Sequence, residues 1–248
     1  MRVQLVKLAR SVRARGVTAT WALARKNITH ELRWYLDRRF DRIHGTETSD
    51  RIELADLDVV GEHRDQGVYY EPTSTRIFRH IMDRVADQIR CQEFTFVDYG
   101  SGKGRTLLMA SDYPFQEIVG VEFSGQLHQT AMRNIEAYRG KRQRCKQLRS
   151  VHADATLFAP PSANLLIYFF NPFLKSVMAQ VLGNVAAAVR SSGLKVVLVY
   201  LNPLSSQVVE DSGLFVRSRD IRLPFDFTRE VQRGCRVFYS WDTAVSAD

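Results

Sequence analysis

The chain has few cysteines and no long hydrophobic run, and both shortages exclude classes of protein. Its three cysteines, Cys91, Cys145 and Cys235, are far apart, odd in number and form no CxxC pair. This argues against a disulfide framework or a metal cluster, and it favours a reducing compartment, which we take to be the cytoplasm. The longest apolar runs, LLIYFF and VVLVYL, are far shorter than the roughly 20 residues of a membrane-spanning helix, so no transmembrane segment is expected. Runs of this length are typical of buried parallel strands.

Acidic residues are absent from the first 26 positions. Residues 1–42 hold eleven Lys and Arg but only three acids, so this segment carries the whole net charge of +8 and the remaining chain is balanced. The positive field therefore belongs to an N-terminal arm. Three interpretations stay open: a solvated helix packed on the core, a helix that contacts an acidic partner such as RNA or anionic lipid, or an Arg-rich targeting peptide.

The arm is predicted to be helical. Apolar residues recur at helical spacing in LVKLARSV, and Ile28, Leu32, Leu36 and Phe40 form a four-residue repeat, which predicts a helix with this stripe turned inward. Gly45 and its polar neighbours then end the helix. We place a basic helical extension at residues 1–60 and the main domain at residues 61–248.

Within the main domain, strand and helix patterns alternate. A helix with one apolar face follows Ser74, and strands are expected within 94–100, 117–123, 145–154, 164–173 and 195–203, with helices within 103–111, 124–140 and 174–193. The C-terminal region has a different pattern, since residues 213–223 and 235–241 are strand-like with no long helix between them. Alternation predicts an α/β fold with a mostly parallel, seven-stranded sheet that finishes in an antiparallel hairpin.

A glycine-rich turn, FVDYGSGKGR (96–105), follows the first of these strands. In parallel sheets, ligands bind at such strand-to-helix turns. A phosphate-binding Walker loop requires GxxxxGK followed by Ser or Thr, and this spacing fails. A dinucleotide fingerprint requires a small residue where this chain has Arg105. Asp98 would also repel a pyrophosphate, because like charges repel. A cationic ligand such as S-adenosylmethionine, with its ammonium and sulfonium groups, fits the carboxylate better.

The motif VDYGSGKGR resembles motif I of the class I S-adenosylmethionine-dependent methyltransferases. VGVE, HADA and NPF follow in the order in which that family has its next motifs. More narrowly, HGTETS, YEPTS, FVDYGSGKGR, GVEFS and FNPF are similar to a group of bacterial class I methyltransferases, over about residues 40–205. The resemblance implies a Rossmann-like methyltransferase fold with S-adenosylmethionine as cofactor.

The resemblance also implies roles for particular residues. Asp98 and the loop residues would hold the amino-acid end of the cofactor, Glu122 the two ribose hydroxyls, and Asp154 the adenine amino group. Apart from the resemblance, Tyr70 and Thr73 are expected to fold over the cofactor, because the helix that they introduce leads directly into the first strand. The expected cofactor-binding set is Tyr70, Thr73, Asp98, Gly100, Ser101, Gly102, Gly104, Glu122, Phe123 and Asp154. We expect His44, His128 and His152 to be packed or exposed side chains and not catalysts.

The acceptor is expected to meet the methyl group at Asn171, Pro172 and Phe173. This turn resembles the (N/D)PP(Y/F) element of methyltransferases acting on nitrogen, in which a side-chain oxygen accepts N–H bonds of the acceptor. This chain has one proline where that element has two. A nitrogen or oxygen of a protein side chain or of a small molecule is favoured as acceptor, and RNA comes behind because the catalytic domain has no basic surplus. The alternative is a catalytically silent binding module of the same fold that uses its basic arm on RNA or an anionic membrane.

Overall fold

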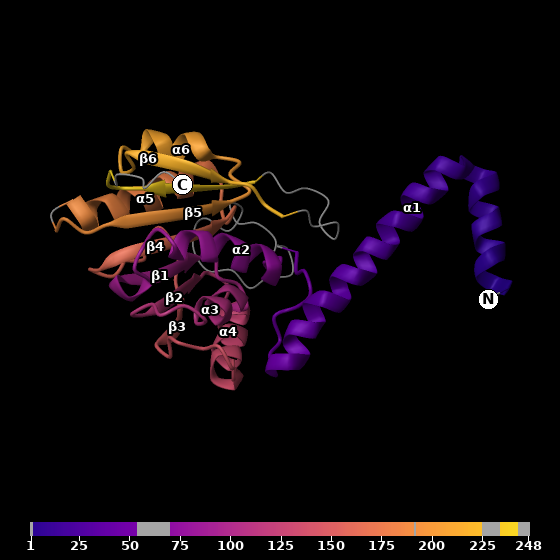
Figure 1. The fold of residues 1–248 in the computed structure, drawn as a ribbon, viewed down its shortest axis with the longest axis horizontal. Coiled ribbons are helices and arrows are strands. Elements are labelled where there is room, and N and C mark those ends of the chain that lie inside the picture. Colours follow the sequence, from indigo (N-terminus) through magenta and orange to yellow (C-terminus); the bar gives the residue numbers. More distant parts are fainter. Residues whose placement is uncertain (1, 54–69, 191, 225–233, 243–248) are drawn as a thin grey trace.

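The computed structural model describes residues 2–53, 70–190, 192–224 and 234–242. Its described part contains a seven-stranded sheet of order β3-β2-β1-β4-β5-β7-β6 (Figure 1). The first five strands are parallel, and β7 runs antiparallel to both of its neighbours. This confirms the predicted sheet and its antiparallel finish. The strands are β1 (Phe94–Tyr99), β2 (Ile118–Glu122), β3 (Leu148–His152), β4 (Asn164–Phe170), β5 (Val196–Leu201), β6 (Arg217–Ile221) and β7 (Cys235–Tyr239).

Helices alternate with these strands as the patterns predict. Ser124 caps α4 by accepting a hydrogen bond from the Leu127 backbone N–H. The short helix α6 was not predicted, because six residues are too few to show a helical period. The helices are α1 (Arg2–His44), α2 (Thr75–Ala86), α3 (Arg105–Ala110), α4 (Gly125–Ala137), α5 (Lys175–Arg190) and α6 (Ser206–Asp211), with a 3-10 turn, η3, at Cys91–Glu93.

Two apolar cores lie on opposite faces of the sheet, because successive strand residues point to opposite sides. Phe96 of β1 belongs to the core under α2 and α3, and the next residue, Val97, belongs to the core under α5 and α6. All six residues of β1 are buried, so its apolar side chains pack on both faces of the sheet, and Asp98 is the one carboxylate among them. The apolar face predicted for α2 is buried as expected.

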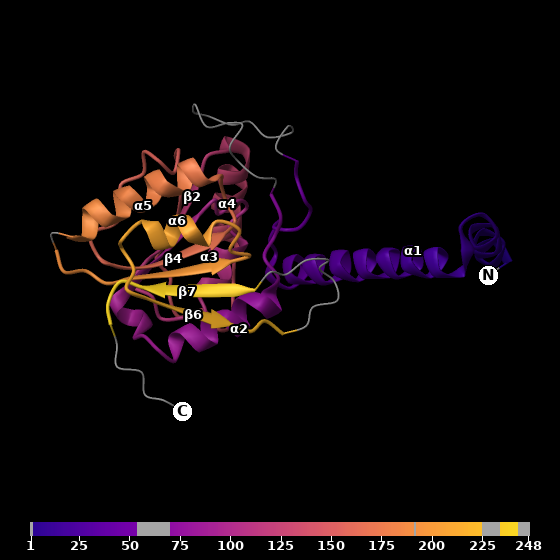
Figure 2. The ribbon, with the colours of Figure 1, turned by 90° about the horizontal axis from the view of Figure 1, so that it is seen from above.

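The N-terminal arm is one helix, α1, kinked at Gly16. Figures 1 and 2 show α1 reaching away from the sheet, with only its C-terminal end against the domain. The predicted inward stripe is therefore wrong at two of its four residues: Phe40 is buried and Leu32 half-buried, but Ile28 and Leu36 are exposed. The spacing is helical, but the sequence does not show where the helix leaves the domain.

The expected boundary between residues 60 and 61 lies outside the described residues. Over the part of the chain that the structure describes, no helix combines the length and the apolar character needed to cross a membrane.

Candidate functional site

The glycine turn lies where the strand order reverses. From β1 the chain continues to β2 and β3 on one side, and later to β4 and β5 on the other, so β1 and β4 form the switch point at which such sheets bind ligands. At the carboxyl ends of these strands, the Cβ position of Gly100 would lie 2.9 Å from Pro172 Cβ. The structure thus brings together the glycine turn and the Asn171–Phe173 turn, which are far apart in the sequence.

Gly102 lies against Tyr70, which was predicted to fold over the cofactor and in the structure covers this turn. A Cβ at Gly102 would lie 2.2 Å from the Tyr70 ring, and the Tyr70 hydroxyl donates to the Thr48 carbonyl at 2.7 Å. Tyr70 also pairs with Ile52 in an isolated antiparallel bridge. Tyr70 therefore ties the segment before the domain to the glycine turn. Burial raises the pKa of its hydroxyl, so Tyr70 is neutral here.

The Gly100→Ala variant is expected to lose stability, because Gly100 has a φ of +78° and an added methyl group would overlap Pro172. We expect the free energy of unfolding to fall by about 1–3 kcal/mol in urea titrations. Gly183→Ala is the matched control, since Gly183 lies in α5 with nothing within 4 Å of an added Cβ. That variant should be as stable as the wild type or up to about 1 kcal/mol more stable. Equal losses for both variants would contradict the packing argument.

Asp98 is a buried carboxylate at the end of β1. The Thr106 hydroxyl donates to its Oδ2, and no ion pair joins Asp98 to a cationic side chain among the described residues. Burial, and less strongly the negative Glu122, raise the pKa of Asp98 to about 7, against the lowering effect of the Thr106 hydrogen bond. This site therefore holds a carboxylate whose ionised form a cationic ligand would stabilise.

Glu122 ends the neighbouring strand β2 and is also buried. Its Oε2 accepts a hydrogen bond from the Gly102 backbone N–H at 2.7 Å, and its Oε1 accepts one from the Ser124 N–H at 3.0 Å. One carboxylate therefore orients both the glycine turn and the start of α4. A carboxylate has two oxygens with about four acceptor sites, so one such group can hold backbone N–H groups and hydroxyl donors of a ligand together.

Other predicted residues are used differently. The Ser101 side chain lies over Gly120, with its Oγ 2.5 Å from where a Gly120 Cβ would be, and its backbone N–H and carbonyl bond Val121 and Gly104, so Ser101 shapes the turn. Gly104 faces Ala131 and lets α4 approach the turn. Asp154 Oδ1 accepts from the Thr156 N–H at 2.8 Å and the Thr156 hydroxyl at 2.7 Å, which makes it the cap of its own turn.

The ends of β2 and β3 meet through Phe123 and two histidines. Phe123 is half-buried, and its carbonyl lies 3.2 Å from His152 Nε2. The His152 ring stacks on His128, whose Nδ1 lies 2.8 Å from Ser150 Oγ. Burial, and secondarily the neighbouring His152, lower the pKa of His128. Their contacts link α4 to the strand ends, as expected for packed residues. Thr73, the remaining predicted residue of this region, is buried just before α2.

Asn171 follows β4 in a left-handed conformation, with φ of +48°. Its Oδ1 accepts a hydrogen bond from the Tyr200 hydroxyl at 3.3 Å, and that hydroxyl accepts one from the Ser205 N–H at 3.3 Å. Because Ser205 occupies a lone pair of the hydroxyl, the Tyr200 proton is available to Asn171. The sequence alone gave no reason to single out Tyr200, which β5 brings beside Asn171. Phe173 packs on the core with Phe169, at 5.7 Å between ring centroids.

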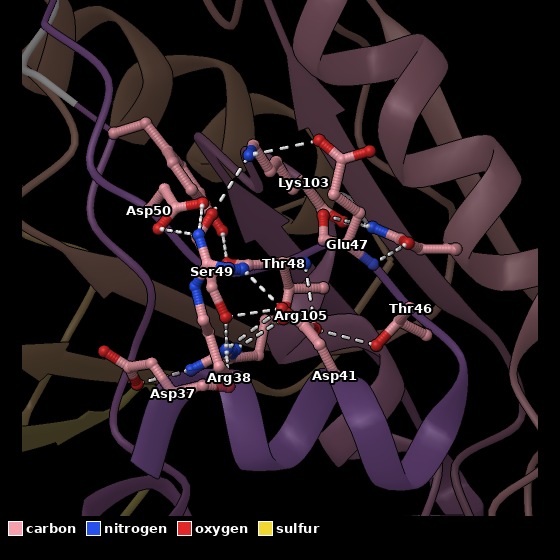
Figure 3. Close-up of polar contacts among 12 residues, drawn as sticks. Asp37, Arg38, Asp41, Thr46, Glu47, Thr48, Ser49, Asp50, Lys103 and Arg105 are labelled. Atoms are coloured by element: carbon pink, nitrogen blue, oxygen red, sulfur yellow. Dashed lines mark hydrogen bonds and ion pairs between the residues drawn. The ribbon is translucent and has the colours of Figure 1, made fainter. Parts of the chain in front are cut away.

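A buried arginine joins the arm to the domain, and sequence reasoning missed this function (Figure 3). Arg105 begins α3 directly after the glycine turn and has only 2% of its side chain exposed. Its guanidinium bonds Asp37 Oδ1 at 2.6 Å and the Asp37 carbonyl at 2.9 Å, and its Nε donates to Thr48 Oγ1 at 2.7 Å. The Phe40 ring lies 5.0 Å from the guanidinium carbon. The sequence signal that could have indicated this function is a charged residue at the start of the mostly apolar segment RTLLMA.

Asp41 organises the segment after α1. Its two carboxylate oxygens accept hydrogen bonds from the backbone or hydroxyl groups of Thr46, Thr48 and Ser49, at 2.5–2.9 Å. Burial acts to raise the pKa of Asp41, but the combined hydrogen bonds outweigh it and the net pKa is lowered. Asp41 therefore stays ionised and shapes the HGTETS segment into a loop that wraps Arg105.

The same loop contacts the glycine turn from the other side. Asn134 of α4 accepts from the Glu47 N–H at 2.7 Å and donates to the Lys103 carbonyl at 2.9 Å. The Lys103 ammonium donates to the Ser49 carbonyl at 3.0 Å and lies 3.6 Å from the Glu47 carboxylate. Figure 3 shows Lys103 and Arg105 reaching the loop between α1 and the domain. Within the described residues, no group of three or more His, Cys, Asp or Glu side chains could hold a metal ion.

No protein-family model and no curated protein matches this chain. Several solved structures do. One is an RNA methyltransferase from Salinibacter ruber in complex with S-adenosyl-L-homocysteine, which is 19% identical with a TM-score of 0.41. Another is a SAM-dependent methyltransferase from Aquifex aeolicus, which is 12% identical with a TM-score of 0.45. Each of these two matches covers 68% of this chain and 92% of the other chain. The mitomycin 7-O-methyltransferase is 15% identical with a TM-score of 0.46 over 65% of this chain.

The chain spans 52% of the mitomycin enzyme, and 55% and 65% of matching proteins from Nostoc punctiforme and Listeria monocytogenes. Because the sequence identities and TM-scores are this low, we assign the fold from the strand order of the sheet. The order β3-β2-β1-β4-β5-β7-β6, with an antiparallel β7, is that of the Rossmann-like class I methyltransferase fold. This confirms the resemblance at the level of the fold, which by itself does not define an activity.

Proposed function

We propose that this protein transfers a methyl group from S-adenosylmethionine to a nitrogen or oxygen of a protein side chain or a small molecule. The observation that carries the proposal is the buried Asp98 carboxylate at the switch point, which has no ion pair among the described residues. A buried carboxylate is stabilised by a cationic partner, and the ammonium and sulfonium of this cofactor would supply one. A pyrophosphate-bearing dinucleotide would be repelled by it.

The neighbouring residues fit the same ligand. Gly102, held by Glu122, packs under the Tyr70 ring and leaves no room for a side chain at this turn, so Tyr70 would cover the cofactor from this side. The Glu122 carboxylate would accept hydrogen bonds from the ribose hydroxyls, and Phe123 and Asp154 follow the strand ends where the adenine would bind. The cofactor, when bound, would supply an electrophilic methyl group on a cationic sulfur.

Asn171 would position the acceptor. Its Oδ1 has a second lone pair beyond the Tyr200 bond, and this lone pair can accept an N–H or O–H of the acceptor. The acceptor's own lone pair would then point toward the methyl group near the Gly100–Pro172 contact. Holding two reactants in line can lower a reaction barrier by roughly 7–11 kcal/mol in favourable cases. Alignment of the two reactants is therefore the main catalytic contribution that we assign to the protein.

Calorimetry on the purified full chain tests the cofactor assignment. We expect binding of S-adenosylmethionine and S-adenosylhomocysteine but not of NAD. Tight binding of NAD, or no binding of the first two ligands, would overturn the proposal.

The affinity for S-adenosylmethionine is expected to depend on pH through Asp98. Its pKa in the free protein is raised to about 7, and a cationic ligand binds the ionised form, which lowers the pKa in the complex. Affinity should therefore be constant above pH 7 and fall by up to about tenfold per pH unit below it. The Asp98→Asn variant should bind more weakly and lose this dependence. A wild-type affinity that is flat between pH 5 and 8 would contradict the role of Asp98.

The acceptor class can be tested by incubating the protein with an extract of its native cells and methyl-labelled cofactor, followed by separate protease and ribonuclease digestion. Label released by protease, or recovered in small molecules, agrees with the proposal, whereas label released only by ribonuclease identifies RNA as the acceptor. The Asn171→Ala variant should keep its cofactor affinity and lose at least about tenfold in transfer rate. Cofactor binding without any transfer would favour a silent binding module.

A further inference from the structure

The outer part of α1 carries large apolar side chains in solvent. Trp21, Ile28 and Val17 are 71%, 63% and 69% exposed, and Tyr35 is half exposed. Trp21, Ile28 and Tyr35 are seven residues apart, which is close to two helical turns, so they share one side of the helix. Isolated exposed apolar residues are normal, but an aligned row of them marks a contact surface.

This row faces away from the domain. The opposite side of the same helix is the one that binds the domain, through Asp37, Phe40 and Asp41. Asp37 is two residues, or about 200° around the helix, from Tyr35. Figures 1 and 2 show this helix standing clear of the sheet, so the row is accessible while the helix remains anchored by Arg105.

The charge of the arm decides between the possible partners. Residues 1–42 have eleven basic and three acidic residues, and Arg13, Arg39 and Arg42 are exposed. Two such arms would repel each other, which disfavours a second copy of the chain. RNA would satisfy the charge but leave exposed the aliphatic side chains of Val17 and Ile28. An anionic lipid surface satisfies both, because basic side chains bind headgroups while apolar ones enter the interface.

We infer that α1 is an interfacial anchor, which lies in the plane of an anionic lipid surface with Val17, Trp21, Ile28 and Tyr35 toward the acyl chains. The inference does not depend on the proposed methyl transfer. It places the domain at a membrane surface by way of the buried Arg105 contacts.

Sedimentation of the full chain with vesicles tests this inference. We expect the protein to bind vesicles of phosphatidylcholine with one third phosphatidylglycerol, to bind pure phosphatidylcholine vesicles at least tenfold more weakly, and to lose binding between 50 and 500 mM salt. A Trp21→Ser/Ile28→Ser variant should partition into the anionic vesicles at least tenfold less than the wild type. The matched control is Leu157→Ser/Val216→Ser, which removes two equally exposed apolar residues from the domain and should bind as the wild type does.

Circular dichroism must first show the same helix content and melting temperature for both variants and the wild type. Equal vesicle binding by the Trp21→Ser/Ile28→Ser variant and the wild type would overturn the inference. Binding to a polyuridine RNA without binding to vesicles would also overturn it and point to RNA. A dimer in light scattering that the same variant abolishes, without vesicle binding by the wild type, would identify a second copy as the partner.

Discussion

We expect the Arg105→Met variant to have a free energy of unfolding about 3–5 kcal/mol lower than that of the wild type. Methionine keeps much of the side-chain volume but removes the guanidinium, which leaves the Asp37 carboxylate and the Thr48 hydroxyl without their buried donor. The cost is large because the Asp37 carboxylate, whose side chain is 14% exposed, loses a buried cationic partner. Urea titration followed by tryptophan fluorescence measures it, and hydrogen exchange should show faster exchange at residues 41–50.

The matched control for this variant is Arg149→Met. Arg149 bonds Glu117 at 2.6 Å, the same distance as in the Arg105–Asp37 pair, but both partners are partly exposed. Exposed ion pairs contribute little, so this variant should lose less than about 1 kcal/mol. Similar losses in the two variants would show that Arg105 does not anchor the arm.

The Glu122→Gln variant is expected to lose at least about 30-fold in affinity for S-adenosylmethionine, or about 2 kcal/mol. The wild-type carboxylate accepts from the Gly102 N–H and the Ser124 N–H at once. A glutamine amide has one oxygen, so its NH2 group must face one of these two donors. The glycine turn would shift, and the ribose hydroxyls would lose a charged acceptor. Calorimetry at pH 7.5 gives the affinity directly.

Glu117→Gln tests whether the effect is specific to this end of the strand. Glu117 directly precedes β2, at the end opposite to Glu122, and pairs with Arg149 on the surface. Its substitution should leave the cofactor affinity unchanged. If Glu122→Gln binds the cofactor as tightly as the wild type while both variants melt normally, the proposed ribose role is wrong.

The glycine turn shows how far sequence reasoning reached. The pattern predicted a turn between β1 and α3, and local spacing was sufficient for this because the turn is continuous in the chain; its role as a ligand loop stays a prediction. The same pattern could not show that Ser101 points at Gly120, or that Asp154 caps its own turn through Thr156. Those outcomes depend on which neighbouring strand supplies the space or the donor.

Arg105 shows the limit more clearly. Sequence reasoning used it only to exclude a dinucleotide fingerprint, whereas in the structure it binds Asp37, 68 positions away. Likewise, the repeat at Ile28, Leu36 and Phe40 gave the helix but not its surroundings, since a helical period is the same against a domain, a lipid surface or water. Only the position of the helix relative to the sheet shows which members are buried.

The sequence by itself determined the order of strands and helices, the parallel sheet, the glycine turn and the concentration of positive charge in the arm. These follow from periodicity and composition, which are local properties of the chain. Only the tertiary structure decided that Tyr70 covers Gly102, that Pro172 meets Gly100, that Tyr200 holds Asn171, and that Arg105 fastens the arm. Those contacts join residues that are distant in the chain, and only the packed sheet with its helices brings them within reach of one another.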